Sequence, residues 1–162
     1  MGKINLLRVD DRLIHGQVMT KWSKGMGTNA LYVIDDDTAA DDFMKEIYIS
    51  TNSSANLAIK VYSVAEVIEE YNKTQFGNDK AILLFKTIKN AKAVIDAGLP
   101  TEVLNIGGIA KKPNSTFVIS TVGLTKDDAD LLKEVEDKRI EVYFQIVPDT
   151  PKVSLADAIK KL

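Results

Sequence analysis

The residue types most able to do chemistry in this chain lie close together near its N-terminus. His15 is the only histidine, and it follows two arginines, Arg8 and Arg12, and two aspartates, Asp10 and Asp11. A neutral imidazole is a nucleophile near neutral pH, and arginine binds phosphate through paired, charge-assisted donors. The cluster therefore indicates phosphoryl chemistry on His15, although the same residues are compatible with a structural or solvated histidine in a polar loop.

This cluster is expected at a junction between a strand and a helix. Residues 4–9 form a short apolar run that is predicted as a strand, and residues 16–24 are predicted as a helix with Trp22 on its apolar stripe. A helix N-terminus offers unpaired amide groups to an anion, and a glycine lets a phosphate approach the backbone closely. Gly16 and Gln17 are therefore candidate phosphate-binding or partner-binding residues.

Short apolar runs alternate with amphipathic stretches along the whole chain. Further strands are predicted at residues 30–34, 57–62, 81–85, 103–106, 118–122 and 141–147. Helices are predicted from Thr38 to Ser50, after a capping box of Ser63 and Glu66, from Thr87, from Thr125 and over residues 154–162. Continuous apolar runs favour strands covered on both faces. The pattern predicts an α/β fold: a doubly wound, mostly parallel open sheet with helices on both faces.

The composition narrows the class of protein. The net charge of −2 argues against a general affinity for nucleic acid. The chain has no cysteine, which excludes thiol catalysis, cysteine-based metal sites and disulfides. It contains neither a signal peptide nor the roughly 20 consecutive apolar residues of a membrane helix. We therefore expect a cytoplasmic protein that meets a membrane only through partners.

Two segments carry a resemblance to a known family. The stretch RVDDRLIHGQVMTKW resembles the N-terminal motif of the IIB subunits of the mannose/fructose/sorbose family of the phosphoenolpyruvate-dependent sugar phosphotransferase system. Residues 105–110, with the sequence NIGGIA, are similar to that family's Asn-Val-Gly-Gly segment. The resemblance covers essentially the whole chain and implies one IIB-type domain over residues 1–162.

The resemblance also implies a function for the histidine cluster. His15 would receive a phosphoryl group from the phosphohistidine of a IIA subunit, carry it on Nδ1, and deliver it to a sugar bound in the membrane-embedded IIC and IID subunits. Arg12 would neutralise the phosphoryl group, and Arg8 would share that task or face the partner. Asp10 and Asp11 would shape the loop and orient Arg12. The scheme requires no cofactor and no metal.

Other residues are candidates for the edge of this site. Lys86 and Thr87 follow the predicted strand 81–85 and are expected on the same sheet edge as His15, where they would contact phosphate or IIA, unless Thr87 only caps a helix. Gly107 and Gly108 would permit a tight exit from a strand and border the site. Trp22 is expected to pack in the core.

Two other functional classes remain open at this point. Asp35 to Asp37 could support a metal-dependent phosphatase or phospho-acceptor domain, although capping of the helix that begins at Thr38 is the favoured interpretation. A non-catalytic regulatory domain of the same fold is the third class. The apolar residues from Val142 to Val147 permit a homodimer, but core packing explains them equally well. Mannose, fructose, sorbose, glucose and amino sugars all remain candidate substrates.

Overall fold

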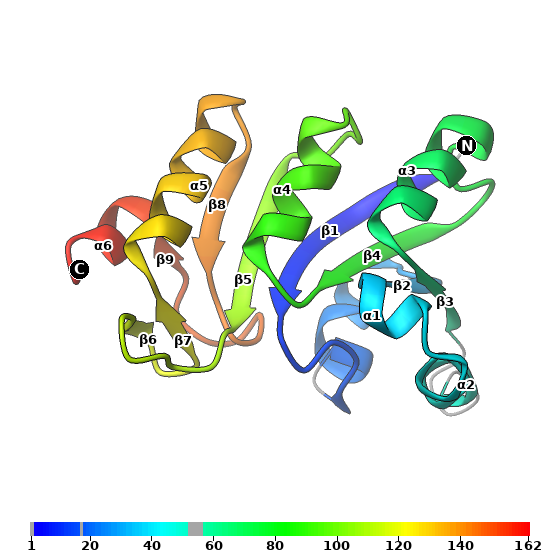
Figure 1. The fold of residues 1–162 in the computed structure, drawn as a ribbon, viewed down its shortest axis with the longest axis horizontal. Coiled ribbons are helices and arrows are strands. Elements are labelled where there is room, and N and C mark those ends of the chain that lie inside the picture. Colours follow the sequence, from blue (N-terminus) through cyan, green and yellow to red (C-terminus); the bar gives the residue numbers. More distant parts are fainter. Residues whose placement is uncertain (1, 17, 52–56) are drawn as a thin grey trace.

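A seven-stranded sheet forms the centre of the molecule. The computed structural model describes residues 2–16, 18–51 and 57–162, and Figure 1 shows its ribbon. The strand order is β3-β2-β4-β1-β5-β8-β9, in which every neighbouring pair is parallel except β8 and β9. The strands are β1 (Lys3–Asp10), β2 (Ala30–Ile34), β3 (Ala58–Tyr62), β4 (Lys80–Phe85), β5 (Val103–Gly108), β8 (Glu141–Phe144) and β9 (Val153–Ser154).

Helices cover both faces of this sheet and enclose two hydrophobic clusters. One cluster joins Leu7 and Val9 of β1 to the helices α3 (Val64–Thr74), α4 (Ile88–Asp96), α5 (Lys126–Asp137) and α6 (Leu155–Ile159). Figure 1 shows α3, α4 and α5 lying along one face. The other cluster contains Leu6 and Trp22, and it packs against α1 (Asp36–Ala39) and α2 (Asp42–Ser50). The predicted fold class is therefore confirmed.

Most of the predicted helix starts are confirmed. Ser63 and Glu66 form a complete capping box, and the hydroxyls of Thr87, Thr125 and Ser154 cap α4, α5 and α6. These oxygens accept hydrogen bonds from amide groups that have no partner inside the helix.

The prediction for Thr38 was wrong. The segment that it was expected to open consists of two helices, α1 and α2, whose N-caps are Asp35 and Asp41. Thr38 lies inside α1 and is buried, and both its amide and its hydroxyl donate hydrogen bonds to Asp35. The carboxylate three residues upstream is the better cap, and the sequence pattern did not distinguish the two.

The predicted strand at residues 118–122 was also wrong. The structure has a separate antiparallel hairpin there, made of β6 (Thr116–Ile119) and β7 (Val122–Leu124). Val118 and Val122 are both buried in the core, so two short strands produce the same apolar signal as one longer strand. The hairpin follows β5 in the chain, and Ile109, the residue after β5, pairs with Val122 of β7. Figure 1 shows the hairpin beside the end of β5.

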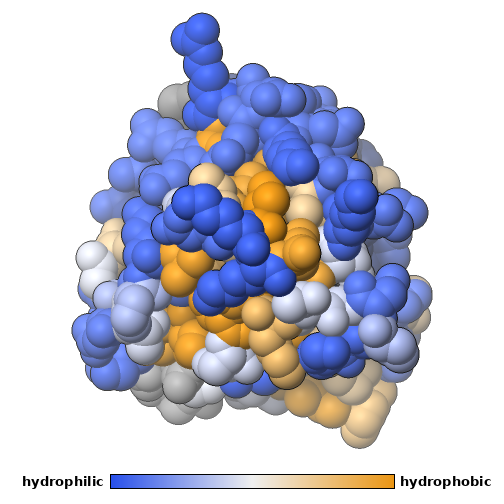
Figure 2. Space-filling model, turned by 90° about the vertical axis from the view of Figure 1, so that its left-hand side faces the viewer, coloured by the Kyte–Doolittle hydropathy of each residue, from blue (hydrophilic) through white to orange (hydrophobic). Residues whose placement is uncertain are grey.

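The apolar residues that suggested a homodimer belong to the core. Val142, Phe144 and Val147 are buried, and β9 pairs with β8 and covers its edge. Figure 2 views this end of the molecule and shows apolar side chains interrupted by hydrophilic ones. Core packing therefore accounts for these residues, and they give no support to a dimer. Within the described residues, no helix has the length and apolar character needed to cross a membrane.

Candidate functional site

The loop that carries His15 leaves the centre of the sheet. β1 lies between β4 and β5, at the point where the winding of the chain changes direction, and ligands bind at this place in doubly wound sheets. The loop begins with a turn in which the Leu13 amide donates to the Asp10 carbonyl at 2.8 Å. Leu13 has a φ of 56° and is completely buried. A strained residue of this kind persists only when packing holds it, so the Leu13 side chain anchors the loop.

Asp11 connects the turn to the end of β5 and to the residues that follow it. Its amide donates to the Gly108 carbonyl at 3.0 Å, and its carboxylate accepts from the Ala110 amide at 2.7 Å. Asp11 therefore shapes the loop, and its contact with phosphate or a partner stays a prediction.

The Asp10 carboxylate is the centre of the site. It is fully buried, and its Oδ2 accepts from Arg8 Nη2 at 3.1 Å, Arg12 Nη2 at 3.0 Å and His15 Nε2 at 3.0 Å. Its Oδ1 accepts from the Arg12 amide and from Arg12 Nε, both at 3.1 Å. One carboxylate thus holds both arginines and the histidine, which is a larger role than the loop-shaping that the sequence suggested.

This environment keeps Asp10 ionised. Burial alone would raise the pKa of the Asp10 carboxyl, but hydrogen bonds from His15 and Arg12 and the charge of Arg8 outweigh it. The pKa of Asp10 consequently lies well below its ordinary value. Hydrogen bonds to the charged form of a carboxylate favour that form, so Asp10 acts only as an acceptor near neutral pH.

The ionised carboxylate fixes the tautomer of His15. Because Asp10 can only accept, the proton in their hydrogen bond belongs to His15 Nε2. In a neutral imidazole the lone pair is then on the other ring nitrogen, Nδ1. The imidazole side chain is 16% exposed, so the ring is held from one side and still reaches the surface.

The two arginines differ in accessibility. The Arg12 side chain is 48% exposed, and the hydrogen bond that it donates to Asp10 raises the pKa of its guanidinium. Arg8 is completely buried, and burial lowers the pKa of its guanidinium even though Asp10 acts in the opposite direction. The expectation that Arg8 meets phosphate or a partner surface is therefore wrong, because no part of this side chain reaches the surface.

The adjacent glycines make room for these charged side chains. A Cβ atom on Gly107 would lie 2.1 Å from Arg8 Nη2, and one on Gly108 would lie 2.7 Å from Asp10 Oδ1. Both glycines belong to β5 itself and are buried. They were expected to form a strand exit that borders the site, whereas they are the wall against which Arg8 and Asp10 pack.

The segment after His15 differs from the predicted helix. It consists of a π-helix, η1 (Val18–Trp22), and a short 3₁₀ helix, η2 (Lys24–Met26). Five residues are too few for the sequence to separate a π turn from an α turn, and π turns occur often at functional sites. A Cβ on Gly16 would meet nothing within 4 Å, so the backbone there is accessible. Gln17 lies outside the described residues.

Lys86 and Thr87 lie at the same sheet edge as His15. Phe85, the residue before them, is opposite Val9 in the parallel pairing of β4 with β1. Thr87 caps α4 through a hydrogen bond from the Asn90 amide at 3.2 Å. The Lys86 Nζ is 3.8 Å from an Asp35 oxygen, with 42% of the side chain exposed. Phosphate or partner contact by either residue stays a prediction.

The aspartates after β2 serve as backbone acceptors. Asp35 accepts from the Thr38 amide at 3.1 Å, and Asp36 accepts from the Val64 amide at 2.8 Å. Two of the three carboxylates are thus committed to different backbone groups, which favours capping over a shared magnesium ion. Among the described residues, no three acidic or histidine side chains are grouped so that they could hold a metal ion.

Three residues that support the site were not recognised from the sequence. Arg8 donates to Asn105 Oδ1, to the Gln145 carbonyl at 3.2 Å and to the Ile146 carbonyl at 3.0 Å. Asn105 was noted only as part of a motif, and the two carbonyls are main-chain atoms that leave no signal in a sequence. Trp22 is buried as expected, and its Nε1 also donates to the Ile146 carbonyl at 3.0 Å.

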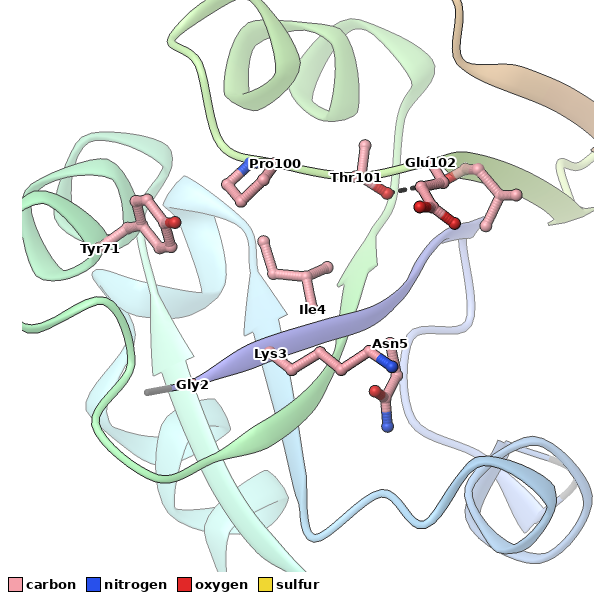
Figure 3. Close-up of a pocket in the computed structure, with 9 residues that line it drawn as sticks. Gly2, Lys3, Ile4, Asn5, Tyr71, Pro100, Thr101 and Glu102 are labelled. Atoms are coloured by element: carbon pink, nitrogen blue, oxygen red, sulfur yellow. Dashed lines mark hydrogen bonds between the residues drawn. The ribbon is translucent and has the colours of Figure 1, made fainter.

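A cavity of about 510 Å³ lies at the opposite edge of the sheet. Gly2 to Asn5 line it at the start of β1, and residues 100–103 line it at the start of β5, as Figure 3 shows. The cavity contributes nothing to the site described above.

The fold and the site together define a doubly wound α/β protein that presents an oriented histidine beside an exposed arginine. Comparison with known proteins identifies the class. The family model for the PTS system sorbose subfamily IIB component matches residues 4–162. The chain belongs to this family of the sugar phosphotransferase system.

Individual relatives agree with this assignment. The chain is 30% identical over 159 residues to the mannose-specific EIIAB component of Escherichia coli K12, a match that covers 98% of this chain and 49% of the relative. The chain therefore spans about half the length of that relative. It is 29% identical to the sorbose-specific EIIB component of Lacticaseibacillus casei, covering 98% of this chain and 96% of that protein.

A solved structure is similar over nearly the whole chain. The crystal structure of manxB from Thermoanaerobacter tengcongensis superposes with a TM-score of 0.90 at 41% identity, covering 99% of this chain and 97% of that one.

The close packing of Arg8 against β5 predicts that alanine substitutions at two glycines will have very different effects on stability. Gly107→Ala should lower the free energy of unfolding by about 1–3 kcal/mol, because the new methyl group overlaps the buried guanidinium. Urea denaturation measures this change. Gly25→Ala is the matched control: a Cβ there meets nothing within 4 Å, so stability should change by less than about 0.5 kcal/mol. Equal stabilities for the two variants would refute this packing.

The ionised Asp10 predicts a pH-dependent contribution to stability. Because its pKa is lowered on folding, the contribution is complete above the unfolded pKa of about 4 and is lost as the pH falls through the lower folded pKa. Asp10→Asn should therefore cost about 3 kcal/mol at pH 7 and clearly less at pH 3. Asp37→Asn, which alters an exposed carboxylate, should have little effect at either pH. An Asp10→Asn penalty that is independent of pH would contradict the assigned charge.

Proposed function

We propose that His15 is the residue that accepts and then donates the phosphoryl group in this IIB component. The observation that carries the proposal is the hydrogen bond between His15 Nε2 and the buried Asp10 carboxylate, which leaves the nucleophilic lone pair on Nδ1 of a partly exposed ring. Membership of the IIB family supports the same reaction.

The proposed transfer uses a direct in-line displacement. Nδ1 of His15 attacks the phosphorus, the P–N bond to the donor histidine breaks, and the donor imidazole leaves with the electron pair. The His15 ring then bears a phosphoryl group on Nδ1 and keeps its proton on Nε2, so the ring becomes cationic. The Asp10 carboxylate stabilises that cation at a distance of 3.0 Å.

Arg12 supplies the charge that the phosphoryl group needs. Its guanidinium is half-exposed and lies next to His15 through their shared contact with Asp10. Phosphoryl transfer depends mainly on positioning and on neutralising negative charge. Rotation of Arg12 away from Asp10 would bring its paired donors to the phosphoryl oxygens.

Membership of the IIB family supports two kinds of partner for this scheme. We propose a IIA protein with a phosphohistidine as the donor, and a sugar bound in membrane IIC and IID subunits as the acceptor. Residues 1–162 would act as one IIB unit in the cytoplasm and would meet the membrane through these subunits. The relatives are named for mannose and for sorbose, so the acceptor proposed here is a sugar of that class.

A labelling experiment tests the proposal. Protein mixed with phosphoenolpyruvate, the two general phosphocarriers and a matching IIA should take up one phosphoryl group, in an acid-labile and alkali-stable bond. His15→Ala should abolish uptake and keep the circular dichroism spectrum of the wild type. Labelling that persists in this variant would refute the assigned residue, and an acid-stable label that is released by hydroxylamine would favour an aspartyl phosphate.

A pair of arginine variants tests the second role. Arg12→Ala should slow phosphoryl uptake by about a hundredfold or more, because the charge on the transferring group is then poorly neutralised. Its stability should change much less, since the side chain is half-exposed. Arg139→Ala removes an exposed guanidinium after α5 and should leave the rate unchanged. Similar rates for Arg12→Ala and wild type would exclude this role.

A further inference from the structure

Arg8 occupies a closed slot inside the protein. Gly107 forms one wall, since a Cβ there would lie 2.1 Å from Arg8 Nη2. The ring of Trp22 lies on the guanidinium, with 5.1 Å between Cζ and the ring centroid. The side chain is completely buried and so cannot touch a docked partner or a phosphoryl group. Its effect on the site must therefore pass through a neighbouring residue.

That neighbour is Asp10. Arg8 Nη1 donates to Asn105 Oδ1 and to the Gln145 carbonyl, and Nη2 donates to the Ile146 carbonyl and to Asp10 Oδ2. Asp10 is the acidic acceptor in this set, and Asp10 also holds His15.

Asn105 fixes the direction in which Arg8 points. It lies opposite Arg8 in the pairing of β1 with β5 and is completely buried. Its Oδ1 accepts from Arg8, and its Nδ2 donates to the Gln145 carbonyl at 3.3 Å. Both ends of the amide are thus engaged, and the oxygen is directed at the guanidinium.

The two arginines can consequently take different parts during the reaction. The Arg12 side chain is 48% exposed and so has room to turn towards an incoming phosphoryl group; such a turn would remove two of the side-chain hydrogen bonds to Asp10. Asp10 is buried, so water cannot easily replace those donors. Arg8 is enclosed by the slot and keeps its contact with Asp10.

We propose that Arg8 and Asn105 are positioning residues for phosphoryl transfer: Asn105 directs Arg8 onto Asp10, and Arg8 keeps Asp10 in place on His15 Nε2 while Arg12 moves to the phosphoryl group. The inference rests on the proposed role of His15. It adds a buried chain of hydrogen bonds, here called the relay, that runs from Asn105 through Arg8 and Asp10 to His15. A buried ion pair contributes little net stability compared with apolar residues of similar size. A purely structural role for Arg8 and Asn105 therefore predicts no change in the tautomer of His15.

Asn105→Leu and Arg8→Lys test this relay in the full chain. The leucine has similar bulk but no acceptor for Arg8, and the lysine keeps the charge but loses the fork that joins Asn105 to Asp10. Each should slow phosphoryl uptake from phospho-IIA by about 10- to 100-fold, with His15 still the labelled residue. ¹⁵N NMR of the unphosphorylated proteins should show the His15 ring changing from the Nε2–H tautomer to a mixture of both tautomers.

Thr121→Val is the matched control. The Thr121 hydroxyl donates to the Gly107 carbonyl at 2.8 Å, so this variant also removes a hydrogen bond to β5 but leaves the relay intact. It should keep the wild-type rate and tautomer. Stability loss alone cannot produce the pattern, because the tautomer reports only on the surroundings of the ring.

A measurement on the wild type covers the case in which both relay variants fail to fold. The Nε–H signal of Arg12 should shift on phosphorylation, whereas the Nε–H signal of Arg8 should keep its position. The proton on His15 Nε2 should still be present. Loss of the Nε2 proton in the phosphorylated protein would overturn the inference. Folded relay variants with wild-type rates and tautomer would also overturn it and would leave His15 as the carrier. Absence of label in the wild type would instead refute the proposed function.

Discussion

A single buried negative charge organises this molecule's reactive end. The Asp10 carboxylate accepts hydrogen bonds from one buried guanidinium, one half-exposed guanidinium and one imidazole, all within 3.1 Å. Burial of a lone carboxylate would be strongly unfavourable, and these donors offset that cost. The constraint extends into the sheet, because β5 must present Gly107 and Gly108 where any larger residue would overlap Arg8 or Asp10.

The same interaction meets two requirements of the carrier role that we propose for His15. In that role the histidine must be accessible to two successive partners, and its ring must nevertheless have a defined orientation and tautomer. A contact on Nε2 from the protein side meets both requirements, because it leaves Nδ1 for chemistry while the ring stays partly exposed. The turn that precedes His15 is held by the buried side chain of Leu13 and by the contacts of Asp11 with Gly108 at the end of β5 and with Ala110.

The sequence contained enough information for the fold class and for the position of the histidine cluster at the end of β1. Apolar runs such as residues 30–34 and 81–85 are strands because they are buried on both faces, and the hydroxyl caps at Ser63, Thr87 and Thr125 depend on local hydrogen bonds. The site itself depends on contacts between distant residues. Arg8 and Arg12 have the same chemistry in the sequence, and only the packing of Trp22 and Gly107 shows that Arg8 is buried. For the same reason the central role of Asp10 and the contribution of Asn105 became visible only in three dimensions.

The most direct test of this account is to identify the ring nitrogen that carries phosphorus. NMR of ¹⁵N-labelled, phosphorylated protein can resolve the coupling between ³¹P and each nitrogen of His15. The account predicts that phosphorus is bonded to Nδ1 and that Nε2 keeps its proton next to Asp10. Phosphorus on Nε2 would mean that the contact with Asp10 breaks before transfer, and it would contradict the organising role of that carboxylate.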